Sequence, residues 1–165
     1  MKKNGKSIDR LDLALLNLVQ RNNLLSADEM AKEIPLSGSA ITRRLRRLRQ
    51  NKIIVGDRSV LNQRFLDERL SGLVQIQLAR HAPDKGLKEL KELLNESDEV
   101  QLCLEISGAH DILLLVTVRD MNDFNQFADR VLATHPAVHR YETSFVKKVV
   151  KTSFVIPLND HDLTS

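Results

Sequence analysis

The spacing of apolar residues first changes from that of helices to that of strands near residue 70. Between residues 8 and 50 they recur at helical spacing, for example at Ile41, Leu45 and Leu48. From Leu73 onward they alternate with polar residues, as they do in half-buried strands. This switch predicts an all-helical N-terminal domain followed by a domain built on a sheet.

The N-terminal third has the spacing of a helix-turn-helix with a supporting helix in front of it. Ser26 and Glu29 have the spacing of a capping box, which predicts a short second helix that ends at Pro35. Ser37 then suits the N-cap of a third helix. In this motif the second helix of the pair enters the major groove of DNA, so the third helix is the predicted recognition helix.

The predicted recognition helix, residues 37–50, contains five arginines and no acidic residue. Solvated helix faces usually interleave acids with bases, because like charges four residues apart repel each other. Contact with a polyanion explains the segment better than a plain surface does, and the arginine fork matches phosphate and guanine edges. Arg43 and Arg47 lie opposite the apolar stripe. The residues expected to contact double-stranded DNA are Ser37, Ser39, Ala40, Thr42, Arg43, Arg44, Arg46 and Arg47.

Charge is distributed unevenly along the 165 residues, whose formal net charge is +3. Residues 1–56 hold 12 Lys/Arg and 5 Asp/Glu, and residues 57–165 hold 13 and 17. This asymmetry suggests that polyanion binding and a second task belong to separate domains. Cys103 is the only cysteine, which excludes an internal disulfide and fits a reducing, cytoplasmic compartment. The sequence has no signal-peptide pattern and no membrane span.

The rest of the chain has the order strand, helix, strand, strand, helix, strand, which is the ferredoxin-like βαββαβ order. The fold class is therefore α+β: a winged-type helix-turn-helix domain (1–56), a linker strand (57–70) and a ferredoxin-like sandwich (71–165). The apolar run that begins at Ile53 is expected to form the strand that leads into the linker. Because helices would cover only one face of an apolar sheet, we expect two sheets to meet in a dimer.

The sequence shows no catalytic or metal-binding pattern. No Cys, His and carboxylate group has zinc-ligand spacing, and neither a phosphate-binding glycine loop nor a nucleophile elbow is present. Residues 107–111 include Ser, His and Asp, but residues in one turn do not form a triad. By spacing alone this segment is a plain hairpin, in which Gly108 supplies a positive φ and Asp111 bonds the backbone. We therefore expect no enzyme activity, no cofactor and no metal.

Several motifs, taken in order, resemble those of the leucine-responsive regulatory protein (Lrp/AsnC) family of transcription regulators. The resemblance covers nearly the whole chain. Departures from the family pattern are Pro35 in the motif turn, Gly38 after the N-cap, Arg49 at a commonly acidic position and His110 at an aromatic one. The motifs that carry the resemblance are Ile8–Asp12, Leu36–Ser37, Arg44–Leu48, Ala82–Asp84, Ser107–Asp111 and Pro136–Thr143.

The resemblance implies a DNA-binding dimer that assembles into larger even oligomers, often octamers. It also implies that an amino acid or related metabolite binds between dimers, near the turn before Ile112. In that site Asp111 would bind the ligand ammonium, backbone amides near Gly108 its carboxylate, and His110 would face its side chain. The expected effector-binding residues are Gly108, Ala109, His110, Asp111 and Thr143.

Two other functions remain open on the sequence alone. A nucleoid-associated protein could organise DNA with little specificity and without an effector. A sirohaem-decarboxylase-like enzyme could use the same two-domain architecture, although the arginine-dense helix argues against it.

Overall fold

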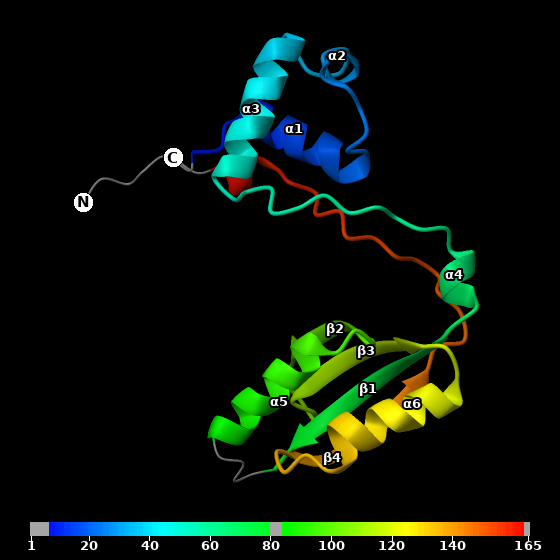
Figure 1. Ribbon diagram of the computed structural model, residues 1–165. Helices are drawn as coiled ribbons and strands as arrows, with labels where there is room; N and C mark the ends of the chain where they lie inside the picture. Colours follow the sequence, from blue (N-terminus) through cyan, green and yellow to red (C-terminus); the bar gives the residue numbers. More distant parts are fainter. Residues whose placement is uncertain (1–6, 80–83, 164–165) are drawn as a thin grey trace. The chain divides into compact units, whose positions relative to one another are not determined.

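The structure is a computed structural model that describes residues 7–79 and 84–163 (Figure 1). The chain divides into two compact units, one drawn from residues 1–60 and 151–165 and the other from residues 61–150. The motif at Ala82 and Pro83 lies outside the described residues.

The N-terminal unit contains three helices, of which the second and third begin at the predicted caps and the first at Asp9, for which no cap was predicted. Asp9 and Ser26 form capping boxes with Asp12 and Glu29, and Ser37 caps the third helix. Apolar side chains at helical spacing meet in one core, which confirms the predicted helix-turn-helix. The helices are α1 (Arg10–Arg21), α2 (Ala27–Met30) and α3 (Gly38–Gln50), and the buried core consists of Leu15, Met30, Ile34 and Ile41.

Helix α3 ends in a Schellman motif instead of leading into a strand. Lys52 adopts a left-handed conformation with φ 56°, and the Ile53 amide donates to the Leu48 carbonyl at 2.9 Å. The prediction of a strand from Ile53 into the linker is therefore wrong, because no strand lies between α3 and β1. The segment has β-branched residues, but no neighbouring strand in the described chain pairs with it. A short helix, α4 (Arg64–Asp67), occupies part of the predicted linker strand.

The C-terminal segment, residues 151–163, packs against α1 and not in the domain to which the sequence assigned it. The Asn17 amide donates to the Leu158 carbonyl at 2.9 Å and accepts the Leu158 amide at 3.0 Å. Gln20 makes the same pair of bonds with Ile156, at 3.1 and 2.9 Å. Because β4 ends at Phe145 and these bonds anchor the tail elsewhere, the predicted 71–165 domain is too long. A 3₁₀ turn, η2 (Asp160–Asp162), follows the anchored residues.

The second unit is a four-stranded antiparallel sheet in the order β2-β3-β1-β4, which confirms the ferredoxin-like prediction. Figure 1 shows β1 and β3 side by side in the middle of the sheet. The predicted second helix continues after α6 as a π-helical segment. The elements of the second unit are β1 (Leu70–Leu78), α5 (Asp84–Glu96), β2 (Val100–Glu105), β3 (Ile112–Val118), α6 (Met121–Phe127), η1 (Ala128–Ala133) and β4 (Val138–Phe145).

The two faces of this sheet differ in burial. Alternate residues of β1 and β3 pack with α5, α6 and η1 in one core, which includes Val74, Leu114 and Phe127. On the other face Leu73 and Leu102 both lie opposite Leu115. The leucines of this face at positions 73, 102 and 104 remain 39 %, 40 % and 42 % exposed. Within this unit, the described residues therefore leave these leucines of one sheet face without a covering layer.

Candidate functional site

The first turn of α3 holds its small polar residues in a fixed arrangement. The Ser37 hydroxyl accepts the Ala40 amide at 3.3 Å and lies 3.1 Å from the Ser39 hydroxyl. The Thr42 hydroxyl donates to the Gly38 carbonyl at 2.9 Å. Ser37, Ser39 and Thr42 are all exposed, so the predicted base-reading end of the helix faces solvent.

Two of the predicted DNA-binding arginines contact carboxylates of α1. Arg44 Nη1 lies 2.6 Å from Asp9 Oδ2 and 2.9 Å from Asp12 Oδ1. Arg47 Nη2 donates to Asp12 Oδ2. Asp12 is fully buried, so this network joins α1 to α3 beneath the helix surface. Arg47, which was expected to lie opposite the apolar stripe, is exposed but also bonds a buried carboxylate, and the charge of Arg44 is paired within its own unit.

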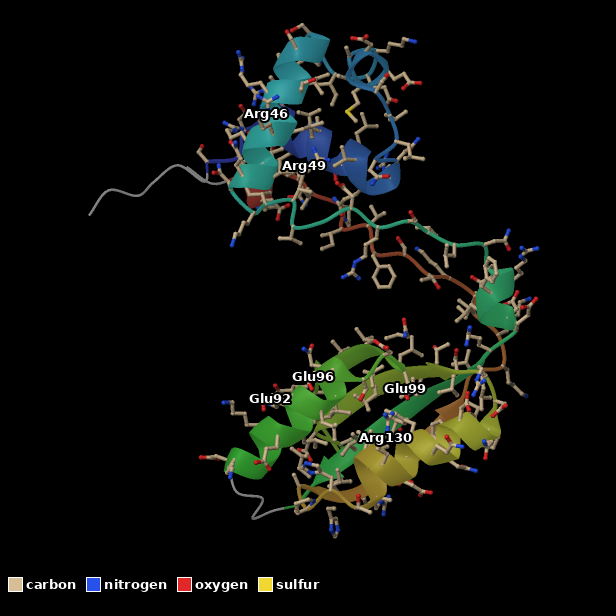
Figure 2. The ribbon with its side chains drawn as sticks, in the orientation of Figure 1. Arg46, Arg49, Glu92, Glu96, Glu99 and Arg130 are labelled. Atoms are coloured by element: carbon tan, nitrogen blue, oxygen red, sulfur yellow. The ribbon has the colours of Figure 1, made fainter. Side chains whose placement is uncertain are left out.

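The other arginines of α3 remain accessible. Arg43 and Arg46 are exposed, and neither has an ion-pair partner among residues 7–79 and 84–163. Arg49 lies 3.3 Å from Asp57, and both side chains are about half exposed. Figure 2 shows Arg46 and Arg49 extending from α3. They border a surface cavity of about 470 Å³ whose lining includes Val19, Met30 and Leu45.

The ion network alters the proton affinity of Asp9. Partial burial acts to raise the pKa of Asp9, but the hydrogen bonds from Arg44 and from the Asp12 amide outweigh it and lower that pKa below its ordinary value. The same contact, with Asp9 first and Asp12 second, raises the pKa of Arg44. The arrangement thus favours the charged form of both partners.

The predicted effector turn lies between β2 and β3, and its aspartate has a structural partner. Gly108 adopts φ 149°, which side chains rarely tolerate, as expected for a hairpin glycine. Asp111 Oδ2 accepts the Leu78 amide at 2.8 Å, and the Asp111 amide donates to the Ile76 carbonyl at 2.9 Å. These bonds fasten the turn to β1, so the hairpin interpretation of Asp111 holds whether or not the turn also binds a ligand.

The turn histidine and the predicted threonine lie on different sides of the sheet. His110 Nε2 lies 3.8 Å from Glu142 Oε2, and its side chain is 16 % exposed. Thr143 is the next residue on β4, so its side chain points to the opposite, helix-covered face, where its methyl group is near Gly72. Its hydroxyl is buried without a hydrogen-bond partner in the described chain. Within one chain, Thr143 is not brought together with the turn.

A second surface cavity, of about 540 Å³, lies near the end of β3 that is remote from the turn. Arg130 contacts Glu99 at 2.6 Å at its border (Figure 2). Arg119 donates two bonds to Asp123, at 2.6 and 2.8 Å, and lowers the pKa of that carboxyl. These charges are largely satisfied by one another. Among the described residues, no group of three Cys, His, Asp or Glu could hold a metal ion, and no helix is long and apolar enough to cross a membrane.

Sequence reasoning missed the partners that hold these sites. Asp9 and Asp12 are three residues apart at the start of α1, and Arg44 and Arg47 are three apart on α3. Matched spacing of opposite charges on two helices was the available signal. Glu142 gave no signal, because an acidic residue on an edge strand is usually a solvated one.

An arginine-rich helix-turn-helix joined to a ferredoxin-like sheet is the architecture of a ligand-responsive transcription regulator. Comparisons with known proteins agree. Residues 8–49 match the AsnC-type helix-turn-helix domain, and residues 63–156 match the Lrp/AsnC ligand binding domain. The chain belongs to the Lrp/AsnC family of transcription regulators.

Its relatives match along nearly their full length. The chain is 33 % identical to the leucine-responsive regulatory protein of Haemophilus influenzae, over 94 % of this chain and 93 % of that protein. It is 34 % identical to the Escherichia coli protein of the same name, over 92 % of each. Among solved structures, an AsnC family regulator from Agrobacterium tumefaciens has a TM-score of 0.84 at 27 % identity, covering 94 % of this chain and 100 % of that one. A transcriptional regulator from Neisseria meningitidis in complex with L-Met has a TM-score of 0.83 at 26 % identity, covering 93 % and 98 %.

Proposed function

We propose that this regulator binds specific double-stranded DNA through α3 and that an amino acid modulates this binding. The observation that carries the DNA assignment is the pair of exposed arginines, Arg43 and Arg46, which have no ion-pair partner in the part of the chain that the structure describes and lie on a capped helix whose other face is in the core. Phosphate contacts supply most of the affinity of such proteins for DNA, and both guanidinium groups are free to make them. In this proposal the protein binds DNA and an effector without catalysing a reaction, and it is located in the cytoplasm at the nucleoid.

The amino-acid assignment is supported by the ligand binding domain and by the L-Met complex of the similar Neisseria meningitidis regulator. We place the effector at the turn of Gly108, Ala109, His110 and Asp111. The positive φ of Gly108 leaves the backbone open to a ligand carboxylate, and no atom lies within 4 Å of where its Cβ would be. Asp111 and Glu142 supply negative charge for a ligand ammonium. Thr143 is left out of the proposed site, because its side chain lies on the helix-covered face of its own sheet.

Assembly through the uncovered sheet face is the third part of the proposal. Three leucines on one flat face form an apolar surface that pairing with a second sheet would remove from water. A dimer built in this way would present two copies of α3 to DNA, so its operator should contain two half-sites with two-fold symmetry. Larger even assemblies, up to an octamer, would follow from further contacts between dimers.

The DNA assignment is tested with fluorescence anisotropy on duplexes enriched from a random pool by the purified protein. Arg43→Ala and Arg46→Ala should each weaken binding and lower the slope of log K against log salt by about one. Lys52→Ala, outside α3, is the matched charge control, and it should change the affinity and the salt slope less than the two arginine variants do. If the double variant of Arg43 and Arg46 binds with unchanged affinity, α3 is not the DNA-contacting helix. Equal binding to enriched and random duplexes would instead favour the nucleoid organiser.

The effector assignment is tested by thermal shift with the common amino acids, followed by calorimetric titration. A ligand at about 100 times its Kd should stabilise the protein by about 2.7 kcal/mol. Asp111→Asn is the informative variant, because its amide oxygen can still accept the Leu78 amide while the charge is lost. Glu142→Gln removes the neighbouring charge without touching that bond. If Asp111→Asn binds the ligand as tightly as the unaltered protein, the ligand ammonium is held elsewhere.

A further inference from the structure

The buried carboxylate of Asp12 contacts two arginines of α3, one with each oxygen. Oδ1 accepts from Arg44 Nη1 at 2.9 Å, and Oδ2 accepts from Arg47 Nη2. Asp9 bonds one arginine, Arg44, at 2.6 Å, and its other carboxylate oxygen accepts the Asp12 amide at the cap of α1. Both aspartates therefore bond Arg44, whereas the orientation of Arg47 depends on Asp12 alone among the described ion pairs.

The two arginines differ in what remains available to a partner. The Arg44 side chain is 22 % exposed and bonds both carboxylates, so it serves as a strut between α1 and α3. The Arg47 side chain is 44 % exposed, and its only described ion pair uses one terminal nitrogen. A guanidinium has five N–H groups, so the rest of the Arg47 fork can bind another molecule.

A guanidinium group whose orientation is fixed by a carboxylate is suited to bind a DNA base. Contact with a phosphate does not require such a fixed orientation. Bidentate contact with O6 and N7 of guanine requires a planar group in one orientation. Holding the group in advance reduces the side-chain entropy that is lost on binding. A phosphate accepts from many directions, so unsupported side chains such as Arg43 and Arg46 suffice there.

We propose that Asp12 is a positioning residue that orients Arg47 to read one guanine in the DNA site. The proposal rests on the proposed function, since it presumes that α3 enters the major groove. It assigns Arg47 to base readout, Arg44 to support of the helix, and Arg43 and Arg46 to the phosphates.

The experiment begins with the base preference of the full-length protein, obtained by enrichment from a random duplex pool. Anisotropy titrations then use the enriched duplex and every single base-pair substitution of it. Asp12→Asn keeps the shape of the side chain, but its amide nitrogen can accept no arginine N–H. We expect it to reduce discrimination at one guanine, and at its symmetry mate, by about ten-fold, with other positions unchanged.

Asp9→Asn is the matched control, because it makes the same charge change and disturbs Arg44 but not Arg47, while its amide oxygen can still accept the Asp12 amide at the cap of α1. It should leave the base preference at that guanine intact. A merely structural loss would weaken binding to all duplexes alike, whereas the proposal requires a change at one position. Thermal melts followed by circular dichroism establish that each variant is folded at the assay temperature.

Arg47→Lys tests the same step without altering a buried residue. Lysine keeps the charge but lacks the planar fork, so affinity for random DNA should remain while the guanine preference is lost. Adding Asp12→Asn to Arg47→Lys should cause no further change in preference. If Arg47→Lys keeps the preference, the proposal is overturned even when Asp12→Asn fails to fold. If the unaltered protein enriches no sequence at all, the proposed sequence-specific function fails first.

Discussion

The side-chain amide of Asn17 forms two hydrogen bonds with the backbone of Leu158, 141 residues further along the chain. The side-chain amide pairs with the tail as a neighbouring β-strand would, because it donates to the carbonyl and accepts from the amide of the same residue. Gln20 repeats the arrangement one helical turn later. Because these bonds use the tail backbone, they hold the tail in place without depending on its side chains.

Asn17→Ala should loosen the tail and lower the stability of the N-terminal unit by about 1–2 kcal/mol, since a typical hydrogen bond contributes about 0.5–1.5 kcal/mol. Trypsin should cleave after Lys151 faster in this variant. The matched control is Asn23→Ala, which removes an exposed amide that has no such partner. Equal cleavage rates in the two variants would show that the tail is held by other contacts.

Acid should weaken the join between α1 and α3. The pKa of Asp9 is lowered in the folded protein. The ionised carboxylate therefore adds to the free energy of unfolding above pH 3.8, its pKa in the unfolded chain, and this addition is lost as the pH falls through the lower pKa of the folded protein. Stability measured from about pH 5 downward should therefore fall less steeply in Asp9→Asn than in the unaltered protein. Urea titrations at each pH provide the measurement, and parallel curves for the two proteins would contradict the assignment. Since Asp9 is half exposed, we expect a modest difference.

Gly108→Ala should destabilise the ligand-binding unit through its backbone alone. The residue has φ 149°, yet an added Cβ would meet no atom within 4 Å. The expected loss is about 1–3 kcal/mol, the usual range for a residue held in a disfavoured backbone region. Gly56→Ala has equally open surroundings and no positive φ, so it should be neutral or slightly stabilising. Thermal melts of the two variants separate backbone strain from crowding.

Leu104→Glu should prevent assembly through the uncovered sheet face. A charge at this position, opposite Leu113 and two residues from Leu102, would have to be buried without a partner if two sheets met there. Light scattering at micromolar concentration should report a smaller species than the unaltered protein gives. Met121→Glu is the control: Met121 is 47 % exposed at the start of α6, where an acidic residue suits the helix N-terminus. A Leu104→Glu variant of unchanged mass would place the subunit interface elsewhere.

Local chemistry explains which parts of the structure could be predicted from the sequence. The cap at Ser37 and the box of Ser26 and Glu29 depend on residues three apart, and alternation in the strands depends on residues two apart. The ion network could not be predicted, because Asp12 and Arg47 are 35 residues apart and their contact depends on how α1 packs on α3. The strand expected from Ile53 failed for a related reason, since β-propensity without a neighbouring strand leaves the ladder unformed.

The candidate effector site was predicted only in part. Asp111 and Gly108 lie in the expected turn, because hairpin chemistry is local. Thr143 was grouped with them by resemblance, but strand alternation directs its side chain to the other face. The contact between His110 and Glu142 depends on the register of β4 against β1, which no short-range pattern specifies.

The anchoring of the tail on α1 has a practical consequence for labelling. A fluorophore attached at His161 would travel with the DNA-binding unit, although it follows β4 in the sequence. A second dye at Lys88, an exposed residue of α5, would instead travel with the ligand-binding unit. Energy transfer between these two positions would follow the separation of the units in solution while the two proposed contact regions, α3 and the turn at Gly108, stay unmodified.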